Sequence, residues 1–255
     1  VEMSLLRTGS ETGGGEDKVK ALPGGIVNII NRLELFNICM PVSPKKKITK
    51  ENNFNYKTNF PSPLERVRVS WKPGTMIYPL PAVMISCGET EEEYNIITIS
   101  WVGTICTNPA MCYISVRPER HSYEIIKRTG EFVINLTNEE LARATDWCGV
   151  RSGKDYNKFR EMELTPAAAE KIKAPIIAEA PICIECKVRE IIPLGSHDMF
   201  IAEVVNVQAD ARYIDKKTDK FDMQKAKLIA YSHGHYYKLG EEIGRFGWTV
   251  RKKPA

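Results

Sequence analysis

From residue 66 onward the chain consists of short apolar runs separated by turn residues, and few segments have the length and periodicity of a helix. The runs that we predict as strands are residues 66–71, 95–102, 111–116, 132–136, 183–192 and 199–209. The apolar run 76–87 contains Pro79 and Pro81, so we expect it to pair cleanly only after Pro81. Helices are predicted at 122–128, from Asn138, and as short pieces opened by Thr165-Pro166 and by Asp222. Strands and helices do not alternate, which predicts a mostly β (α+β) fold: a β-barrel-like core with flanking short helices.

Composition restricts the class of protein. The 255 residues, 43% of them hydrophobic, can build one sizeable core. The formal net charge is only +4 and the basic residues are interspersed with acidic ones, so we predict no nucleic-acid binding. No apolar run reaches membrane-spanning length, and no signal-peptide pattern opens the sequence. Seven cysteines, an odd number, fit reduced thiols, and we expect a cytoplasmic protein without a membrane partner.

Residues 1–65 differ from the rest. Residues 8–18 are Gly-rich and polar, and residues 43–63 combine Lys, Asn and Pro with little apolar periodicity. Between them, residues 26–36 carry apolar side chains at the spacing of one short helix. We expect residues 1–65 to be an N-terminal extension, linker-like or artefactual, and residues 66–255 to form the domain.

The turn after the predicted strand 111–116 has the features of an anion site. Arg120, His121 and Ser122 stand where a helix is predicted to begin, with Ser122 expected to cap the helix and Gly130 to end it. The first turn of a helix has unpaired N–H groups and a partial positive charge, and both attract anions. An ordinary N-cap flanked by two surface charges explains the same residues equally well. The local sequence leaves both interpretations open.

Residues 102–112, VGTICTNPAMC, are predicted as a polar loop between two strands. Such a loop could bind the polar edge of a flat heterocycle, with Trp101 as an apolar wall, although a plain hairpin loop is the simpler interpretation. A metal site of His197, His233 and His235 is conceivable, but no carboxylate or thiolate pattern supports it, so we predict no metal. Cys183 and Cys186 are three positions apart in a predicted strand and should face opposite ways.

Several common site signatures are missing. The sequence lacks G-x-G-x-x-G, G-x-x-x-x-G-K-[ST], G-x-S-x-G and H-E-x-x-H. Residues 149–154 contain two glycines and a lysine, but their spacing is not that of a phosphate-binding P-loop. Dinucleotide-fold, P-loop, hydrolase and zinc-protease chemistries therefore lose their usual support.

A set of longer stretches carries a family resemblance: WKPGTMIYPLPAVMISCG, NIITISWVGTICTNPAMCYISVRPERHSYEIIKRTGEFVINL, TDWCGVRSGKDYNKF, GSHDMFIAEVV and LIAYSHGHYYKLG. In this order they resemble the flavin-reductase-like family, most closely its flavoredoxin branch, over about residues 68–250. The resemblance implies a split β-barrel that binds FMN noncovalently and forms a homodimer with the flavin close to the subunit interface.

The resemblance also implies, position by position, a set of FMN-binding residues: Asn95, Thr98, Ser100, Trp101, Thr104, Cys106, Arg120, His121, Ser122, Lys158, His197 and Tyr236. Among them Arg120, His121 and Ser122 match the turn that receives the phosphate, and Lys158 lies near it. Thr104 and Cys106 match the loop beside the flavin ring, and His197 and Tyr236 match positions near the ring or the interface. Ser122 stands where many members have Thr, which keeps the hydroxyl, and Ala110 stands where relatives often have a second proline.

The anion at the helix start is accordingly predicted to be the FMN phosphate. The flavin itself carries the redox chemistry, so no catalytic side chain is identified, and His197 is kept as a candidate. The first predicted function is a flavin reductase-type oxidoreductase that moves electrons from a donor such as NAD(P)H through FMN. The alternative is a flavoredoxin-like carrier that exchanges electrons with a redox protein partner and does not turn over NAD(P)H. A third is a ligand-binding or regulatory split barrel.

Overall fold

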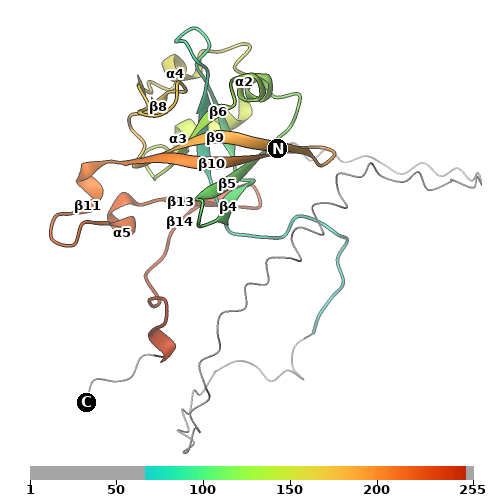
Figure 1. Cartoon of the computed structure of the whole chain (residues 1–255). Coiled ribbons are helices and arrows are strands. Elements are labelled where there is room, and N and C mark those ends of the chain that lie inside the picture. The colour runs from blue at the N-terminus through green and yellow to red at the C-terminus, as the bar shows by residue number, and fades with distance from the viewer. Residues whose placement is uncertain (1–66, 251–255) are drawn as a thin grey trace, which may run out of the picture. The chain divides into compact units, whose positions relative to one another are not determined.

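The computed structural model of the protein describes residues 67–250 (Figure 1). The predicted extension 1–65 therefore lies outside the described residues, and a compact unit begins at Gly74. Residues 67–73 form no strand, and Trp71 is 77% exposed. The predicted strand 66–71 is thus wrong over its described part, because alternation buries one face of a segment only when a neighbouring strand pairs with it.

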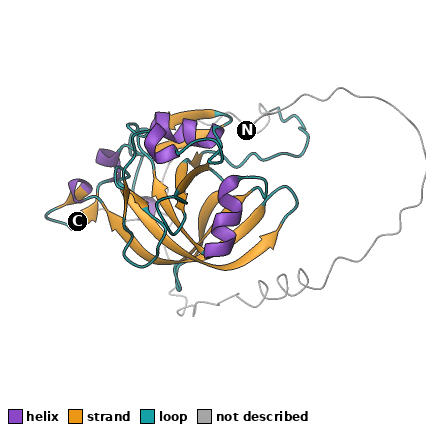
Figure 2. Cartoon of the chain, turned by 90° about the horizontal axis from the view of Figure 1, so that it is seen from above, coloured by secondary structure: helices purple, strands orange, loops and turns teal. Residues whose placement is uncertain are grey.

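A seven-stranded antiparallel sheet, in the order β3-β2-β6-β9-β10-β5-β4, forms the body of this unit. Its strands are β2 (Val83–Cys87), β3 (Asn95–Ile99), β4 (Val102–Cys106), β5 (Met111–Val116), β6 (Glu131–Leu136), β9 (Ile182–Pro193) and β10 (Asp198–Ala209). The long β9–β10 hairpin has two register shifts, and such irregularities increase the local twist. The sheet curls into a half-barrel that stays open between its edge strands β3 and β4, as the curved strands in Figure 2 show.

Smaller elements surround the curled sheet. Three short sheets pair β1 (Leu80–Pro81), β13 (Ile229–Ser232) and β14 (His235–Lys238); β7 (Pro166–Ala167) and β8 (Ile176–Ile177); β11 (Ile214–Asp215) and β12 (Lys220–Phe221). The helices are α2 (His121–Thr129), α3 (Ala142–Val150), α4 (Lys158–Glu161), α5 (Met223–Ala226), η2 (Ala211–Tyr213) and η3 (Trp248–Val250). In the view of Figure 1, α2, α3 and α4 lie above the β9–β10 pair, and α5, β13 and β14 lie below it. No helix among residues 67–250 is long and apolar enough to cross a membrane.

Apolar side chains fill both faces of the sheet at β2, β3 and β6. On β2, Ile85 belongs to a cluster inside the curl, which includes Ile126 of α2, whereas its neighbour Met84 packs with Phe159 of α4 on the other face. This double burial explains why these strands have apolar runs rather than alternating patterns. Cys186 lies in the first cluster and Cys183 in the second, which confirms that they face opposite ways.

Most predicted strands are confirmed with small changes at their ends, as are the end of α2 at Gly130, with φ 67°, and the short helix opened by Asp222. The predicted helix at Thr165-Pro166 is wrong, because Pro166–Ala167 pairs with β8 instead. The helix predicted from Asn138 begins later, at Ala142, since Asn138 forms a bridge with Leu228 and its side chain accepts from the backbone N–H of Leu141.

The predicted loop 102–112 is also wrong in part. Its first half is β4, which pairs with β5, and a turn at 107–110 connects the two strands. Thr104 is accommodated here because β4 is an edge strand of the described sheet. Gly103 makes room for the ring of its partner Tyr113, since a Cβ atom at Gly103 would lie 2.8 Å from Tyr113 Cε1.

A buried carboxylate holds the segment before β9 on the sheet. Glu185 is fully buried, and it accepts hydrogen bonds from the backbone N–H groups of Glu170 (3.1 Å) and Lys171 (2.7 Å). The side-chain amides of Asn206 (2.8 Å) and Gln208 (2.9 Å) complete its shell. Burial by itself raises the pKa of Glu185, but together these four donors lower it below its usual 4.5.

We predict that Glu185→Gln lowers the free energy of unfolding by about 2–3 kcal/mol near pH 7, because an amide presents its own N–H groups to donors and loses charge-assisted bonds. Glu190→Gln, on the exposed side of the same strand, is the control and should change stability by less than about 0.5 kcal/mol. Urea unfolding of both variants measures this.

The difference in unfolding free energy between wild type and Glu185→Gln should also depend on pH. A carboxyl with a lowered folded-state pKa stabilises the protein above its unfolded pKa, so the advantage of the wild type over Glu185→Gln should shrink as pH falls below 4.5. Equal stabilities of wild type and Glu185→Gln at pH 7 would contradict this account of the carboxylate.

Candidate functional site

Three helices converge on the edge strand β3, where the predicted phosphate-binding residues lie. Asn95 is the first residue of β3, and its Nδ2 donates a hydrogen bond to Ser122 Oγ at 2.7 Å. Asn95 is 4% exposed and Ser122 2%. The prediction that Ser122 caps α2 is wrong: the cap position is Arg120, so Ser122 lies within the first turn. Its hydroxyl faces Asn95 rather than serving the helix end.

Lys158 is a buried cation near Ser122, since its charge and the Ser122 hydroxyl both act on the thiol of Cys87. It is the first residue of α4, it is 3% exposed, and its Nζ donates to the backbone carbonyl of Cys148 at 2.7 Å. Cys148 lies in the last turn of α3, where the helix dipole favours a positive charge. Within residues 67–250, Lys158 has no carboxylate partner in the ion pairs. Burial, with a contribution from Arg120, lowers the pKa of Lys158 to about 8, although the thiols of Cys148 and Cys87 act in the opposite direction.

We call Asn95, Ser122 and Lys158 the buried donor cluster. His121 and Arg120 lie near it in the first turn and at the cap of α2. Burial lowers the pKa of His121, and the charges of Lys154 and Lys158 lower it further, so its imidazole is neutral at pH 7. Arg120 is exposed at the start of α2. A hydroxyl, an ammonium group and a helix N-terminus in one place form a donor set that suits a phosphate. The residues present therefore fit the phosphate end of FMN.

Further predicted residues are held in place near α3. Thr98 Oγ1 donates to the carbonyl of Thr145 at 2.5 Å, and the Tyr236 hydroxyl donates to the carboxylate of Asp146, the next residue of α3, at 3.3 Å. Burial, together with Asp146, raises the pKa of Tyr236 to about 12, so its hydroxyl stays protonated at neutral pH. These bonds bring Thr98 of β3 and Tyr236 of β14 to the same helix.

Trp101 and His197 form a parallel ring pair with centroids 6.3 Å apart and an interplanar angle of 3°. His197 lies in the turn between β9 and β10, and Nδ1 of its ring is 2.9 Å from Ser196 Oγ. Burial, and then the charge of Arg117, lower the pKa of His197, which keeps the imidazole neutral at pH 7. Ser100, the half-buried neighbour of Trp101, precedes this pair in the chain.

Thr104 and Cys106 are not joined to the buried donor cluster by any hydrogen bond among the described residues. Thr104 is exposed on β4 opposite Cys112, and Cys106 is half-buried opposite Met111. Their place beside the flavin ring stays a prediction. In the described part of the chain, no three His, Cys, Asp or Glu side chains are grouped as metal ligands. The His233 ring packs against Tyr78, with centroids 4.3 Å apart and an interplanar angle of 41°.

Residues 149–154, which lack the spacing of a P-loop, nevertheless contact the buried donor cluster. A Cβ atom at Gly153 would lie 2.1 Å from Asn95 Oδ1, so only glycine allows this approach. A Cβ atom at Gly149 would lie 3.1 Å from Thr98 Cβ. The sequence signal was the pair of glycines itself, but what each glycine contacts depends on tertiary structure.

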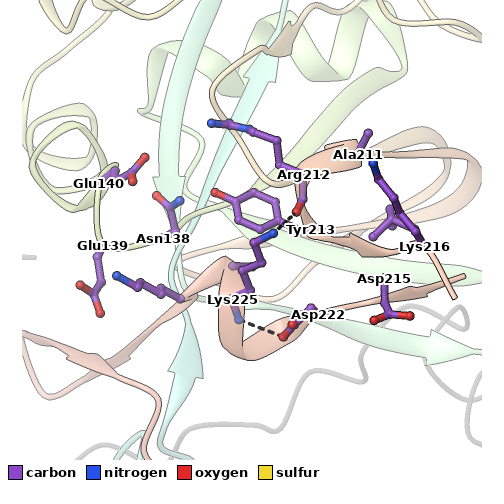
Figure 3. Close-up of a pocket in the computed structure, with 13 residues that line it drawn as sticks. Asn138, Glu139, Glu140, Ala211, Arg212, Tyr213, Asp215, Lys216, Asp222 and Lys225 are labelled. Carbon is purple, nitrogen blue, oxygen red and sulfur yellow. Dashed lines mark hydrogen bonds between the residues drawn. The ribbon is translucent and has the colours of Figure 1, made fainter. Parts of the chain in front are cut away.

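A hollow of about 710 Å³ lies elsewhere, between the turn at Asn138 and residues 211–227 (Figure 3). Its walls contain none of the predicted flavin-binding residues. Some of its charged groups are already engaged: Lys225 Nζ donates to the Arg212 carbonyl at 2.7 Å, and the Asp222 carboxylate accepts from the Lys225 backbone N–H at 2.9 Å. The buried donor cluster is therefore the stronger candidate for an anion.

Known proteins resemble this chain in sequence and in fold. A solved structure of flavoredoxin from Desulfovibrio vulgaris (Miyazaki F) matches with a TM-score of 0.67 and 26% identity, over 72% of this chain and 99% of that one. A protein of Archaeoglobus fulgidus is 30% identical over 143 residues, 56% of this chain and 80% of the relative. The reductase component of a 4-nitrophenol 4-monooxygenase/4-nitrocatechol 2-monooxygenase from Rhodococcus opacus is 30% identical over 112 residues, 44% of this chain and 57% of the relative.

These matches confirm the predicted fold class, a mostly β split barrel with flanking short helices. They also confirm the resemblance on which the flavin site was predicted. The family model described as "Flavin reductase like domain" matches residues 75–240, which include the buried donor cluster and the aromatic pair of Trp101 and His197. The chain belongs to the flavin reductase like domain family.

Proposed function

We propose that the protein is an FMN-binding oxidoreductase of flavin reductase type, which moves electrons from a reduced donor such as NAD(P)H through bound FMN. Its family supports a flavin cofactor. The observation that carries FMN in particular is Lys158, a buried cation without a carboxylate partner among the described residues. Its charge and the hydroxyl of Ser122, in the first turn of α2, both act on the thiol of Cys87. A phosphate dianion there would offset the cost of burying the ammonium group.

In this proposal the chain binds and orients the cofactor. Ser122, Lys158 and Arg120 hold the phosphate, while Trp101 and Thr98 contact the ring. When bound, the flavin supplies hydride and electron transfer. His197, neutral and packed on Trp101, is the side chain that we assign as the candidate proton donor or acceptor.

A second candidate function is a flavoredoxin-like carrier that exchanges electrons with a redox protein and has no NAD(P)H turnover of its own. The structural match to flavoredoxin over 99% of that chain supports it. The similarity to a monooxygenase reductase component supports the first function instead. The two differ in the electron donor and share the FMN site.

We also propose a cytoplasmic homodimer. One short segment near the end of the described residues carries large apolar side chains that are all exposed in the single chain: Leu239, Ile243, Phe246, Trp248 and Val250. Such a concentration of exposed apolar surface is typical of an interface. The six described cysteines are free thiols, which supports a reducing compartment.

We predict that the protein purifies yellow, or becomes yellow on reconstitution, and that the released cofactor is FMN. Absorbance spectroscopy and chromatography of the released flavin measure this. Anaerobic addition of NADH or NADPH should then bleach the flavin if the protein is a reductase. Binding of FMN without bleaching would support the carrier, and a protein that binds no FMN would contradict both functions.

Ser122→Ala should weaken FMN binding by about ten- to a hundredfold, because a hydrogen bond to a charged acceptor contributes roughly 1.5–3 kcal/mol. Riboflavin has the same ring and no phosphate, so its affinity should hardly change. Thr129→Ala, at the far end of α2, is the control and should leave the ratio of the two affinities unchanged. Equal losses for FMN and riboflavin in Ser122→Ala would place the phosphate elsewhere.

FMN affinity should fall as pH rises above 8, by up to about tenfold per pH unit. The pKa of Lys158 is about 8 in the unliganded protein, and a bound phosphate raises it, so above pH 8 binding requires uptake of a proton. Riboflavin titrations report any change in the ring itself, and Lys158→Met should bind FMN weakly with a flat profile in this range. A wild-type FMN profile parallel to that of riboflavin would refute the role of Lys158.

A further inference from the structure

We propose that Asn95 and Gly153 together fix the direction of the Ser122 hydroxyl and so give the site its preference for a phosphate-bearing flavin. This inference rests on the proposed function. Asn95 and Gly153 act as positioning residues: they affect the phosphate through Ser122 and need not contact the phosphate themselves.

The hydrogen bond between Asn95 and Ser122 has a defined direction. A serine hydroxyl has one proton and two acceptor lone pairs. Asn95 Nδ2 donates to Ser122 Oγ at 2.7 Å, so the Ser122 proton is directed away from Asn95. The other side chain that the hydroxyl contacts is the Cys87 thiol, whose pKa burial raises to about 12 and which is therefore a neutral, weak acceptor that an anionic oxygen can replace. Both side chains are at least nine-tenths buried, so bulk water has little access to either. With Lys158 buried nearby and Arg120 at the helix start, an anionic oxygen is the favoured acceptor.

Gly153 holds the side-chain amide of Asn95 in place. The backbone of Gly153 lies against it so closely that a Cβ atom there would be 2.1 Å from Oδ1, 2.6 Å from Cγ and 2.8 Å from Nδ2. A side chain at position 153 would have to displace either the loop or the amide. Glycine thus lets residues 149–154 close over Asn95 and restrict its rotation.

The orientation of the Ser122 hydroxyl affects which flavin the site prefers. A hydroxyl that is already oriented loses less freedom when the phosphate binds, so its hydrogen bond contributes more to affinity. Riboflavin has no phosphate and gains nothing from this orientation. The pair Asn95–Gly153 therefore affects the ratio of FMN to riboflavin affinity rather than flavin affinity in general.

The test is titration of FMN and of riboflavin into four variants of the full chain. Asn95→Asp can only accept the Ser122 proton and adds a negative charge, so FMN affinity should fall by about a hundredfold, and riboflavin affinity by less than about threefold. Asn95→Ala and Gly153→Ala should each lower FMN affinity by about tenfold with little effect on riboflavin. Asn138→Asp keeps the bond accepted from Leu141 and adds the same charge outside the site, so it should leave the FMN-to-riboflavin ratio unchanged.

Gly240→Ala has open space around its Cβ position and is the control for Gly153→Ala. Thermal unfolding without flavin checks that each variant folds. If Asn95→Asp does not fold, Asn95→Ala takes its place in the comparison of FMN and riboflavin affinities. Parallel losses for both flavins, with lower thermal stability, would mean that Asn95 and Gly153 only support the fold, which overturns the inference while leaving the proposed function intact. A wild type that binds FMN no better than riboflavin would overturn the phosphate site itself.

Discussion

The burial of Lys158 is the constraint around which the site is organised. Its ammonium group leaves water and meets the carbonyl of Cys148 at the end of α3, so the first residue of α4 is tied to the neighbouring helix. One carbonyl and a helix dipole offset only part of the cost of removing a charge from water, which is why the pKa of Lys158 is as low as about 8. The start of α2, with Ser122, is the adjacent place where an anion is favoured, and a phosphate there would complete the balance.

This arrangement is possible because helices pack on both faces of the curled sheet. Ile126 of α2 packs on the inner face and Phe159 of α4 on the outer one, so elements from opposite sides of the sheet meet at the edge strand β3. Asn95, at the start of that strand, bonds to Ser122 and lies under Gly153. The chain thus places several donors at one edge of the sheet, and a bound flavin would provide the redox chemistry that its side chains lack.

Much of the fold could be predicted because apolar runs and turn residues are local signals. Strands such as 111–116 and the helix end at Gly130 follow directly from them. Tertiary contacts decided the rest. Ser122 was predicted as a cap, but its hydroxyl pairs with Asn95, 27 positions away, and β4 resembled a loop until its pairing with β5 was known. The glycines of residues 149–154 are visible in the sequence, but the role of Gly153 could not be predicted, because a Cβ atom there is excluded only by the position of Asn95. The residues of the site could be predicted chiefly from the family resemblance. A resemblance over the whole domain indicates which distant residues come together, whereas a local sequence pattern does not.

The central claim is that the buried donor cluster holds the phosphate of FMN. A crystal structure of the protein with FMN tests it most directly. In that structure a phosphate oxygen is expected within about 3.2 Å of both Ser122 Oγ and Lys158 Nζ. A phosphate bound anywhere else, such as in the hollow lined by Arg212 and Lys225, with Lys158 still bonded only to the Cys148 carbonyl, would contradict it.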